Sequence, residues 1–188
     1  MVDKRGKFMN IYVMRHGTTN WNEKRIHQGR SQNRLSKAGK ELAEKVALEN
    51  KNLKIDVIYV SPLMRTIQTA KIMNQYHNVK MIKDERLIEI DQGIFTRRKM
   101  NSLTEEEIKL RDSRSPSCKM ESYESVYSRI KNFVEDIKQN EKNKNILIVT
   151  HKYCSSYLEL ALTNQNPNHN NPAQRELFKN AELKKFVI

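Results

Sequence analysis

The chain has 188 residues and a formal charge of +13 at pH 7, from 35 Lys and Arg against 22 Asp and Glu, and 37% of its residues are hydrophobic. This length suits one domain with a sizeable core and is too short for two domains of ordinary size. No apolar run approaches the roughly 20 residues of a membrane span, and we expect no signal peptide. Two cysteines, Cys118 and Cys154, suggest neither a disulfide framework nor a zinc site, so a reduced, cytoplasmic setting is expected. The positive charge favours anionic partners, namely nucleic acid, membrane lipid or small phosphates.

The first half of the chain alternates predicted strands with predicted helices. Apolar runs at 11–14 and 55–60 are typical of buried strands. Ser36 is a candidate N-cap for a helix, and a second helix follows the second strand. The apolar residues with helical spacing are Leu42, Ala43, Val46 and Ala47 in the first helix and Leu63, Ile67, Ala70 and Met73 in the second. Weaker strands are predicted at 79–82 and 87–88. Residues 99–119, rich in charge, Ser and Pro, predict a small insertion with one short helix at 104–110.

The second half repeats this alternation. Val126, Ile130, Phe133 and Ile137 form the apolar stripe of a long helix, and 146–149 is typical of a strand buried on both faces. A helix over 154–162, an Asn-rich loop over 163–174 and an edge strand at 186–188 follow. The alternation predicts an α/β fold: a three-layer α/β/α sandwich with a mostly parallel central sheet and a small inserted lobe. We expect one domain over residues 1–188, with 99–119 as an insertion near the site.

Polar residues gather where three predicted strands end. Arg15 and His16 follow the first strand, the segment from Ser61 to Arg65 follows the second, and His151 follows the late one. Ligands of parallel sheets bind at the carboxyl ends of the strands. Two guanidiniums and two imidazoles at one edge suit a tetrahedral dianion, because Arg offers paired donors to phosphate oxygens. Taken singly, each residue also fits a structural role, such as a satisfied histidine or a solvated arginine.

Four motifs in order resemble the histidine phosphatase superfamily, also called the phosphoglycerate mutase-like family. The first motif is RHGTTNWN at 15–22, followed by QG at 28–29 and LSKAG at 35–39. The others are SPLMRTIQTA at 61–70, LIEIDQGIF at 87–95 and ILIVTH at 146–151. The resemblance runs nearly end to end and is closest to the phosphatase branch.

The resemblance implies a role for each matched residue. His16 is the nucleophile that becomes phosphorylated, and Glu89 is the general acid and base. Arg15, Arg65 and His151 are the phosphate donors, with Asn22 as a neutral fourth. The neighbouring guanidiniums disfavour imidazolium, which keeps the nucleophile unprotonated, and a nearby phosphate dianion raises the pKa of the acid. No metal or other cofactor is required, because the arginines supply the positive charge.

Alternatives remain open at several positions. Asp91 and Glu85 are rivals for the acid role, and Glu89 read without the family is a surface partner for Arg86. Lys152 follows the second histidine, at a position where the family often has glycine. Arg97 lies shortly after Phe95 of the acidic motif, where glycine is also common in the family. Each of the two is either a contact for a second anionic group of the substrate or a solvated residue at the rim. The expected substrate-binding set is Asn22, Gln28, Thr19, Lys152 and Arg97. The expected bystanders are His27, His169, the core residue Cys154, and Trp21 packed beneath the first loop.

The predicted function is metal-independent hydrolysis of phosphomonoesters through a phosphohistidine intermediate, acting on a small phosphorylated metabolite. One alternative is a cofactor-dependent phosphoglycerate mutase, which in this family carries a longer insertion and tail. The alternative of another class is a non-catalytic polyanion or nucleic-acid binding protein, which the +13 charge would suit. We expect no nucleic-acid or membrane partner, and the sequence leaves the oligomeric state open, a homodimer included.

Overall fold

The computed structural model describes residues 8–167 and 177–188. Its five-stranded sheet has the order β3-β2-β4-β1-β5. The strands are β1 (Asn10–Arg15), β2 (Val57–Val60), β3 (Lys80–Lys83), β4 (Asn145–Thr150) and β5 (Leu183–Val187). All neighbouring strands pair in parallel except β5, which runs antiparallel to β1 at the edge. The prediction of a mostly parallel sheet is confirmed, and the predicted edge strand begins earlier, at Leu183.

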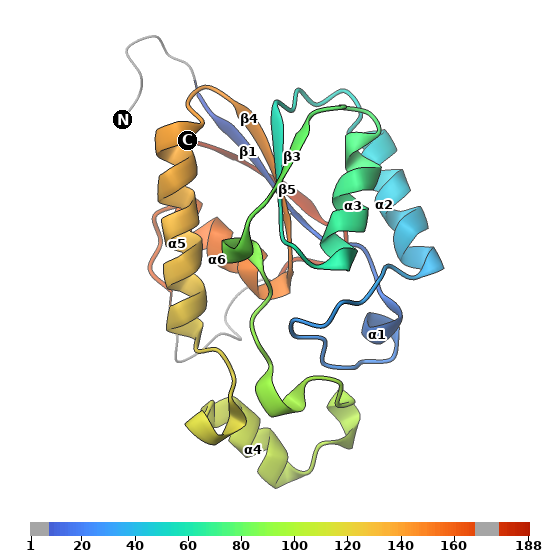
Figure 1. The fold of residues 1–188 in the computed structure, drawn as a ribbon, viewed down its shortest axis with the longest axis vertical. Helices are drawn as coiled ribbons and strands as arrows, with labels where there is room; N and C mark the ends of the chain where they lie inside the picture. The colour runs from blue at the N-terminus through green and yellow to red at the C-terminus, as the bar shows by residue number, and fades with distance from the viewer. Residues whose placement is uncertain (1–7, 168–176) are drawn as a thin grey trace.

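Helices cover both faces of this sheet (Figure 1), so the three-layer prediction is confirmed. Helices α2 (Lys37–Glu49) and α3 (Met64–Asn74) lie on one face, and α5 (Tyr123–Asn140) and α6 (Lys152–Leu162) on the other. Two shorter helices, α1 (Asn20–Glu23) and α4 (Glu105–Ser113), lie beyond the carboxyl ends of the central strands. No described helix is long and apolar enough to cross a membrane.

The central strands are apolar because both of their faces are buried. In β4, Ile146 and Ile148 pack with the core of α5 and α6, whereas Leu147 and Val149 pack with that of α2 and α3. Side chains of a strand alternate between faces, so a strand with helices on both sides needs apolar residues throughout. The predicted stripe of α5 is buried at every position. Ser36 caps α2 as predicted, since its Oγ accepts a hydrogen bond from Gly39 N at 3.1 Å.

Two local predictions are wrong or incomplete. The segment 87–88 is not a strand, because a 3₁₀ turn, η1 (Glu85–Leu87), ends there. The side chain of Asp84 accepts a hydrogen bond from Arg86 N at 2.9 Å and so favours the turn over a strand ladder. The short helix α1 was not predicted; it is held by a capping box between Thr19 and Asn22.

The predicted insertion forms a lobe at one end of the molecule (Figure 1). Within residues 99–119 lie the 3₁₀ turn η3 (Met100–Ser102), helix α4 and the 3₁₀ turn η4 (Pro116–Cys118), while η2 (Gly93–Phe95) leads into it. Helix α4 runs to Ser113, three residues past the predicted end at 110. Residues 163–167 of the predicted Asn-rich loop lack a strand or long helix, and the rest of that loop lies outside the described residues.

Candidate active site

The residues singled out at the strand ends lie together in the structure. Arg15 ends β1 and His16 follows it, Arg65 lies in the first turn of α3, and His151 precedes the first residue of α6. All four are at most 8% exposed. The rings of His16 and His151 meet edge to face, with their centroids 5.3 Å apart. The parallel sheet therefore brings the two imidazoles and two guanidiniums to one place.

The loop after β1 is fixed by close backbone packing on α2. A Cβ on Gly39 would lie 1.9 Å from the carbonyl oxygen of Thr18, and one on Gly17 would lie 2.6 Å from that of Gly39. Ser36 N donates to the same Thr18 oxygen at 3.0 Å. Both glycines are thus required for contact, which explains why the RHG and LSKAG motifs occur together. The nucleophile candidate His16 directly precedes Gly17, so this packing also restricts its backbone.

The hydrogen bonds of His16 define its tautomer. Its Nδ1 lies 2.7 Å from the carbonyl oxygen of Gly17, which can only accept, so Nδ1 carries the proton. Burial lowers the pKa of this imidazole well below its usual value, and the charges of Arg65 and Arg15 lower it further. The ring is therefore neutral near pH 7, and its Nε2 has a free lone pair. This is the state required of a nucleophile.

Arg65 is the most extensively bonded cation of the site. It donates to Gly29 O at 2.8 Å, to Ser31 O at 2.7 Å, and through Nε to Nδ1 of His151 at 3.2 Å. Three of its five N–H groups are used, which leaves two for a ligand. Burial lowers its pKa to about 10, so it remains protonated at neutral pH.

These contacts also orient His151. Its Nδ1 accepts from Arg65, so the proton is on Nε2, which donates to Ser61 Oγ at 2.7 Å. Burial lowers its pKa well below the usual value, and nearby Arg65 adds to this effect. With both nitrogens engaged, His151 positions Arg65 and packs against His16, and it would need to rotate before it could contact a phosphate itself.

Arg15 retains unused donors. Its Nη1 donates to Phe178 O at 2.7 Å, and its buried Nε has no partner among the described residues. Burial lowers its pKa, and the opposite charge of Glu89 partly offsets this. A buried cation with unsatisfied donors is stabilised by an anion that accepts from it.

Glu89 is buried beside the two arginines. It is 8% exposed, and its Oε1 accepts from Ile90 N at 3.0 Å. Burial raises its pKa, although Arg65 and Arg15 act in the opposite direction. A carboxyl with a raised pKa that lines the same cavity as a buried imidazole has the environment of a general acid.

The alternatives to Glu89 are not placed for this role. Arg86 pairs with Asp84 at 2.6 Å and Asp136 at 2.9 Å, so the interpretation of Glu89 as its surface partner is wrong. Asp91 is partly exposed and accepts from Gly93 N, and Glu85 is exposed. Neither Asp91 nor Glu85 lines the cavity that Arg15, His16, Arg65 and Glu89 line.

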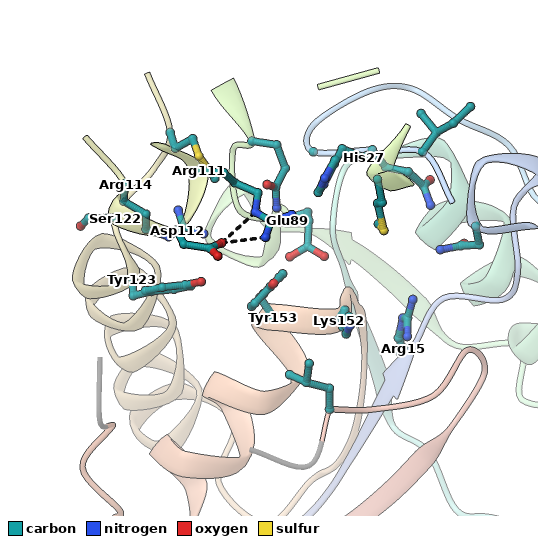
Figure 2. Close-up of a pocket in the computed structure, with 18 of the residues that line it drawn as sticks. Arg15, His27, Glu89, Arg111, Asp112, Arg114, Ser122, Tyr123, Lys152 and Tyr153 are labelled. Carbon is teal, nitrogen blue, oxygen red and sulfur yellow. Dashed lines mark hydrogen bonds and ion pairs between the residues drawn. The ribbon is translucent and has the colours of Figure 1, made fainter. Parts of the chain in front are cut away.

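A cavity of about 910 Å³ opens above these groups (Figure 2). Arg15, His16, Arg65 and Glu89 line it, together with Arg111 and Arg114 of the lobe. The predicted Lys152, Gln28 and Asn22 also line it. Lys152 is half-buried, and both its burial and Arg15 lower its pKa. Asn22 uses Oδ1 to bind Thr19 at 2.9 Å, and its amide nitrogen has no partner among residues 8–167 and 177–188.

Some predicted substrate contacts lie elsewhere. Thr19 is fully buried and caps α1, and Arg97 is exposed; neither lines the cavity, so the structure does not support their assignment to substrate. His27, expected as a bystander, does line it and is 9% exposed. Its position follows from backbone bonds with Arg97 and Arg98, which no local sequence signal indicated.

Cys154 lies in the core as predicted, and burial raises its pKa to about 12. Trp21 is partly buried and does not line the cavity. His169 lies outside the described residues. Among the described side chains, no three of the His, Cys, Asp or Glu type converge to hold a metal ion.

Fold and site together define an α/β protein with a buried, arginine-rich anion site around a neutral histidine. The family model of the histidine phosphatase superfamily (branch 1) matches residues 11–187. The chain therefore belongs to the histidine phosphatase superfamily, as the motifs indicated.

Proteins similar to this chain bear phosphatase and mutase names. Phosphoserine phosphatase 1 of Hydrogenobacter thermophilus is 32% identical over 147 residues, covering 75% of this chain and 70% of that protein. The probable phosphoglycerate mutase GpmB of Escherichia coli is 34% identical over 151 residues, covering 76% and 69%. The solved structure of Bacillus stearothermophilus YhfR has a TM-score of 0.84 at 22% identity, covering 94% and 90%, which supports the fold.

Proposed function

We propose that this protein is a phosphatase that hydrolyses phosphomonoesters through a phosphohistidine intermediate and needs no metal ion. The observation that carries the proposal is the neutral His16, with Nδ1 bound to Gly17 and Nε2 free, between two buried arginines. The protein would act as one domain, with the lobe at 99–119 facing the substrate. Buried, unpaired Cys118 and Cys154 are compatible with a cytoplasmic setting, which is part of the proposal.

In the first step, Nε2 of His16 attacks phosphorus and the bond to the ester oxygen breaks. The departing alkoxide takes the proton of Glu89, so the alcohol leaves neutral and the carboxyl becomes a carboxylate. Arg15 and Arg65 stabilise the equatorial oxygens, which carry most of the charge in phosphoryl transfer. Asn22 donates to the same oxygens as a neutral group.

In the second step, water attacks the phosphohistidine. The Glu89 carboxylate takes a proton from this water, the P–N bond breaks, and inorganic phosphate leaves. Both residues return to their starting states, so the cycle balances without a cofactor. His151 acts here as a positioning residue through Arg65, and rotation of its ring would make it a further donor.

The cavity above His16 favours hydrolysis over return of the phosphoryl group to the substrate. Its volume exceeds the space that a phosphate needs, and the lobe does not seal it, so water reaches the phosphohistidine. A mutase remains the alternative within the family, and GpmB bears such a name. The observation that disfavours the non-catalytic polyanion binder is the buried acid Glu89, which an anion site alone would not need.

The proposed substrate is a small phosphorylated metabolite, with no nucleic acid or membrane involved. Lys152 and Gln28 would contact its non-phosphate part, and Lys152 suits a second anionic group. The phosphoserine phosphatase name of a relative is compatible with a substrate of that kind.

The test is phosphate release from p-nitrophenyl phosphate in the presence of EDTA, with acid-quenched samples assayed for an acid-labile phosphoprotein. We expect turnover and trapped phosphohistidine, and a loss of at least about 10⁴-fold in kcat for His16→Ala. His77→Ala, a histidine remote from the site, is the matched control. An active His16→Ala enzyme would refute the mechanism, transfer between phosphoglycerates without net release would identify a mutase, and salt-sensitive duplex binding without turnover would identify a polyanion binder.

A further inference from the structure

Glu89 lies in an irregular segment, residues 86–91, that belongs to none of the described strands. Side chains from other parts of the fold hydrogen-bond to its backbone. Four successive carbonyl oxygens, those of residues 86–89, each accept a hydrogen bond from a side chain of a different part of the fold. The donors are Arg129 of α5 to Arg86 O at 2.6 Å, Thr150 of β4 to Leu87 O at 2.7 Å, Cys154 of α6 to Ile88 O at 2.9 Å and Arg30 to Glu89 O at 3.2 Å. An irregular buried segment needs such partners for its polar groups, and here they set where the Glu89 carboxyl lies.

Two of these donors meet at one carboxylate, Glu121. Arg129 binds it in a fork, with Nε 2.9 Å from Oε1 and Nη2 3.0 Å from Oε2. Arg30 Nη2 donates to Oε2 at 3.1 Å. The side chains of Arg129 and Glu121 are only 16% and 9% exposed, so this pair is well screened from water. A planar fork fixes both partners in a way that a lysine cannot.

Glu121 also ties down the far side of the segment. Its backbone N–H donates to Asp91 O at 3.2 Å, and its Oε2 accepts from Asp91 N at 3.4 Å. Arg129 thus holds the segment at residue 86 directly and at residue 91 through Glu121, with Glu89 between these points. We define Arg129, Glu121 and Arg30 as the clamp.

We propose that the clamp positions the carboxyl of Glu89 for proton transfer, with Arg129 as its central residue, although it touches no substrate. This inference rests on the proposed function, in which Glu89 protonates the leaving group. A shift of about 1 Å at a catalytic group costs up to about 100-fold in rate, so loosening the clamp has a measurable effect.

Two substrates with different leaving groups distinguish misplacement of the acid from a general loss of active enzyme. p-Nitrophenolate departs without a proton, so kcat/KM for p-nitrophenyl phosphate reports attack by His16 alone. The alkoxide of glycerol 2-phosphate needs the proton of Glu89, so kcat/KM for this ester reports the acid as well. The ratio of the two values follows the acid and cancels losses of active protein.

The experiment compares Arg129→Met, Arg129→Lys and Arg30→Met with wild type on both substrates. We expect Arg129→Met to lower kcat/KM about 10-fold to 100-fold on glycerol 2-phosphate and less than about 3-fold on p-nitrophenyl phosphate. Arg129→Lys should recover only part of the loss, because it keeps the charge without the fork. Lys131→Met, on the exposed side of the same helix, is the control and should leave both values unchanged.

A double-variant cycle completes the test. In a Glu89→Gln background, Arg129→Met should add less than about 3-fold on glycerol 2-phosphate, because the group that it positions is already gone. Equal losses on both substrates, or a full further loss in that background, would overturn the inference. Arg30→Met removes a 40% exposed member of the clamp and remains measurable if Arg129→Met does not fold. A wild-type enzyme inactive on both esters would instead refute the proposed function.

Discussion

The floor of the cavity and the lobe that faces it are built in opposite ways. We use floor for Arg15, His16, Arg65 and Glu89, which line the cavity, and for His151, which packs against His16; all are at most 8% exposed. In the lobe, helix α4 has no buried residue, and Arg114 and Lys119 adopt left-handed backbone conformations. Its ion pair joins the sequence neighbours Arg111 and Asp112, whose side chains are 26% and 62% exposed.

This difference in burial indicates that the floor and the lobe have different functions. Buried charges are costly unless a partner satisfies them, and in the proposed mechanism a bound phosphoryl group is the partner of the floor arginines. Exposed ion pairs contribute little to stability, so the lobe can vary with small cost to folding. We therefore infer that the floor determines the reaction and that the lobe and rim determine which leaving group enters.

The largest effect is expected from a substitution of Glu89, which tests the role of the floor. Glu89→Gln should lower kcat/KM for glycerol 2-phosphate by about 10² to 10⁴-fold, with a much smaller loss for p-nitrophenyl phosphate. The acid works only when protonated, so in wild type the alkyl-to-aryl ratio should fall as the pH rises through the pKa of Glu89. Burial raises that pKa, so the fall lies above the usual carboxyl range. Steady-state kinetics across pH checks this; a pH-dependent ratio persisting in Glu89→Gln would contradict it.

Arg15→Met removes the guanidinium that we propose binds phosphate and that has unused N–H groups. Loss of one preorganised donor to the transition state costs about 10² to 10³-fold in kcat. The loss should be similar for aryl and alkyl esters, because both share the phosphoryl group. Inhibition by inorganic phosphate should weaken in parallel, and an unchanged inhibition constant would show that Arg15 does not face the anion. Arg25→Met, outside the cavity lining, is the control.

Lys152→Met tests the rim between floor and lobe. It should lower kcat/KM about 10-fold for phosphoglycolate, whose carboxylate can meet the ammonium, and less than about 2-fold for ethyl phosphate. Lys152→Arg should restore part of this preference. Equal effects on the two esters would place Lys152 among solvated rim residues, which is the other interpretation of its sequence position.

Arg111→Gln should have the smallest effect and tests the lobe. Its side chain lines the cavity but is already paired with Asp112, so we expect KM to change by about 3-fold or less, in a direction that depends on the ester. kcat for p-nitrophenyl phosphate and inhibition by phosphate should stay unchanged. A large loss of kcat would contradict the separate functions of floor and lobe, and would show that Arg111 belongs to the phosphate site.

The sequence alone predicted a mostly parallel sheet, its four covering helices and the residues that gather in the floor. Alternation of apolar strands with amphipathic helices is a local pattern, and the ends of parallel strands must meet at one edge, so Arg15, His16, Arg65 and His151 could be placed together before any coordinates. The resemblance of the motifs to the family selected Glu89 among the nearby carboxylates as the expected acid, which periodicity could not do.

Only the tertiary structure decided the remaining features. Thr19 and Arg97 are polar and close to motifs, yet Thr19 caps a helix and Arg97 is exposed outside the cavity lining. His27 came to the cavity through backbone bonds to residues about 70 positions away in the chain. The clamp on Glu89 joins Arg30, Glu121 and Arg129, which no spacing rule connects, because side-chain contacts between distant segments depend on how the layers pack.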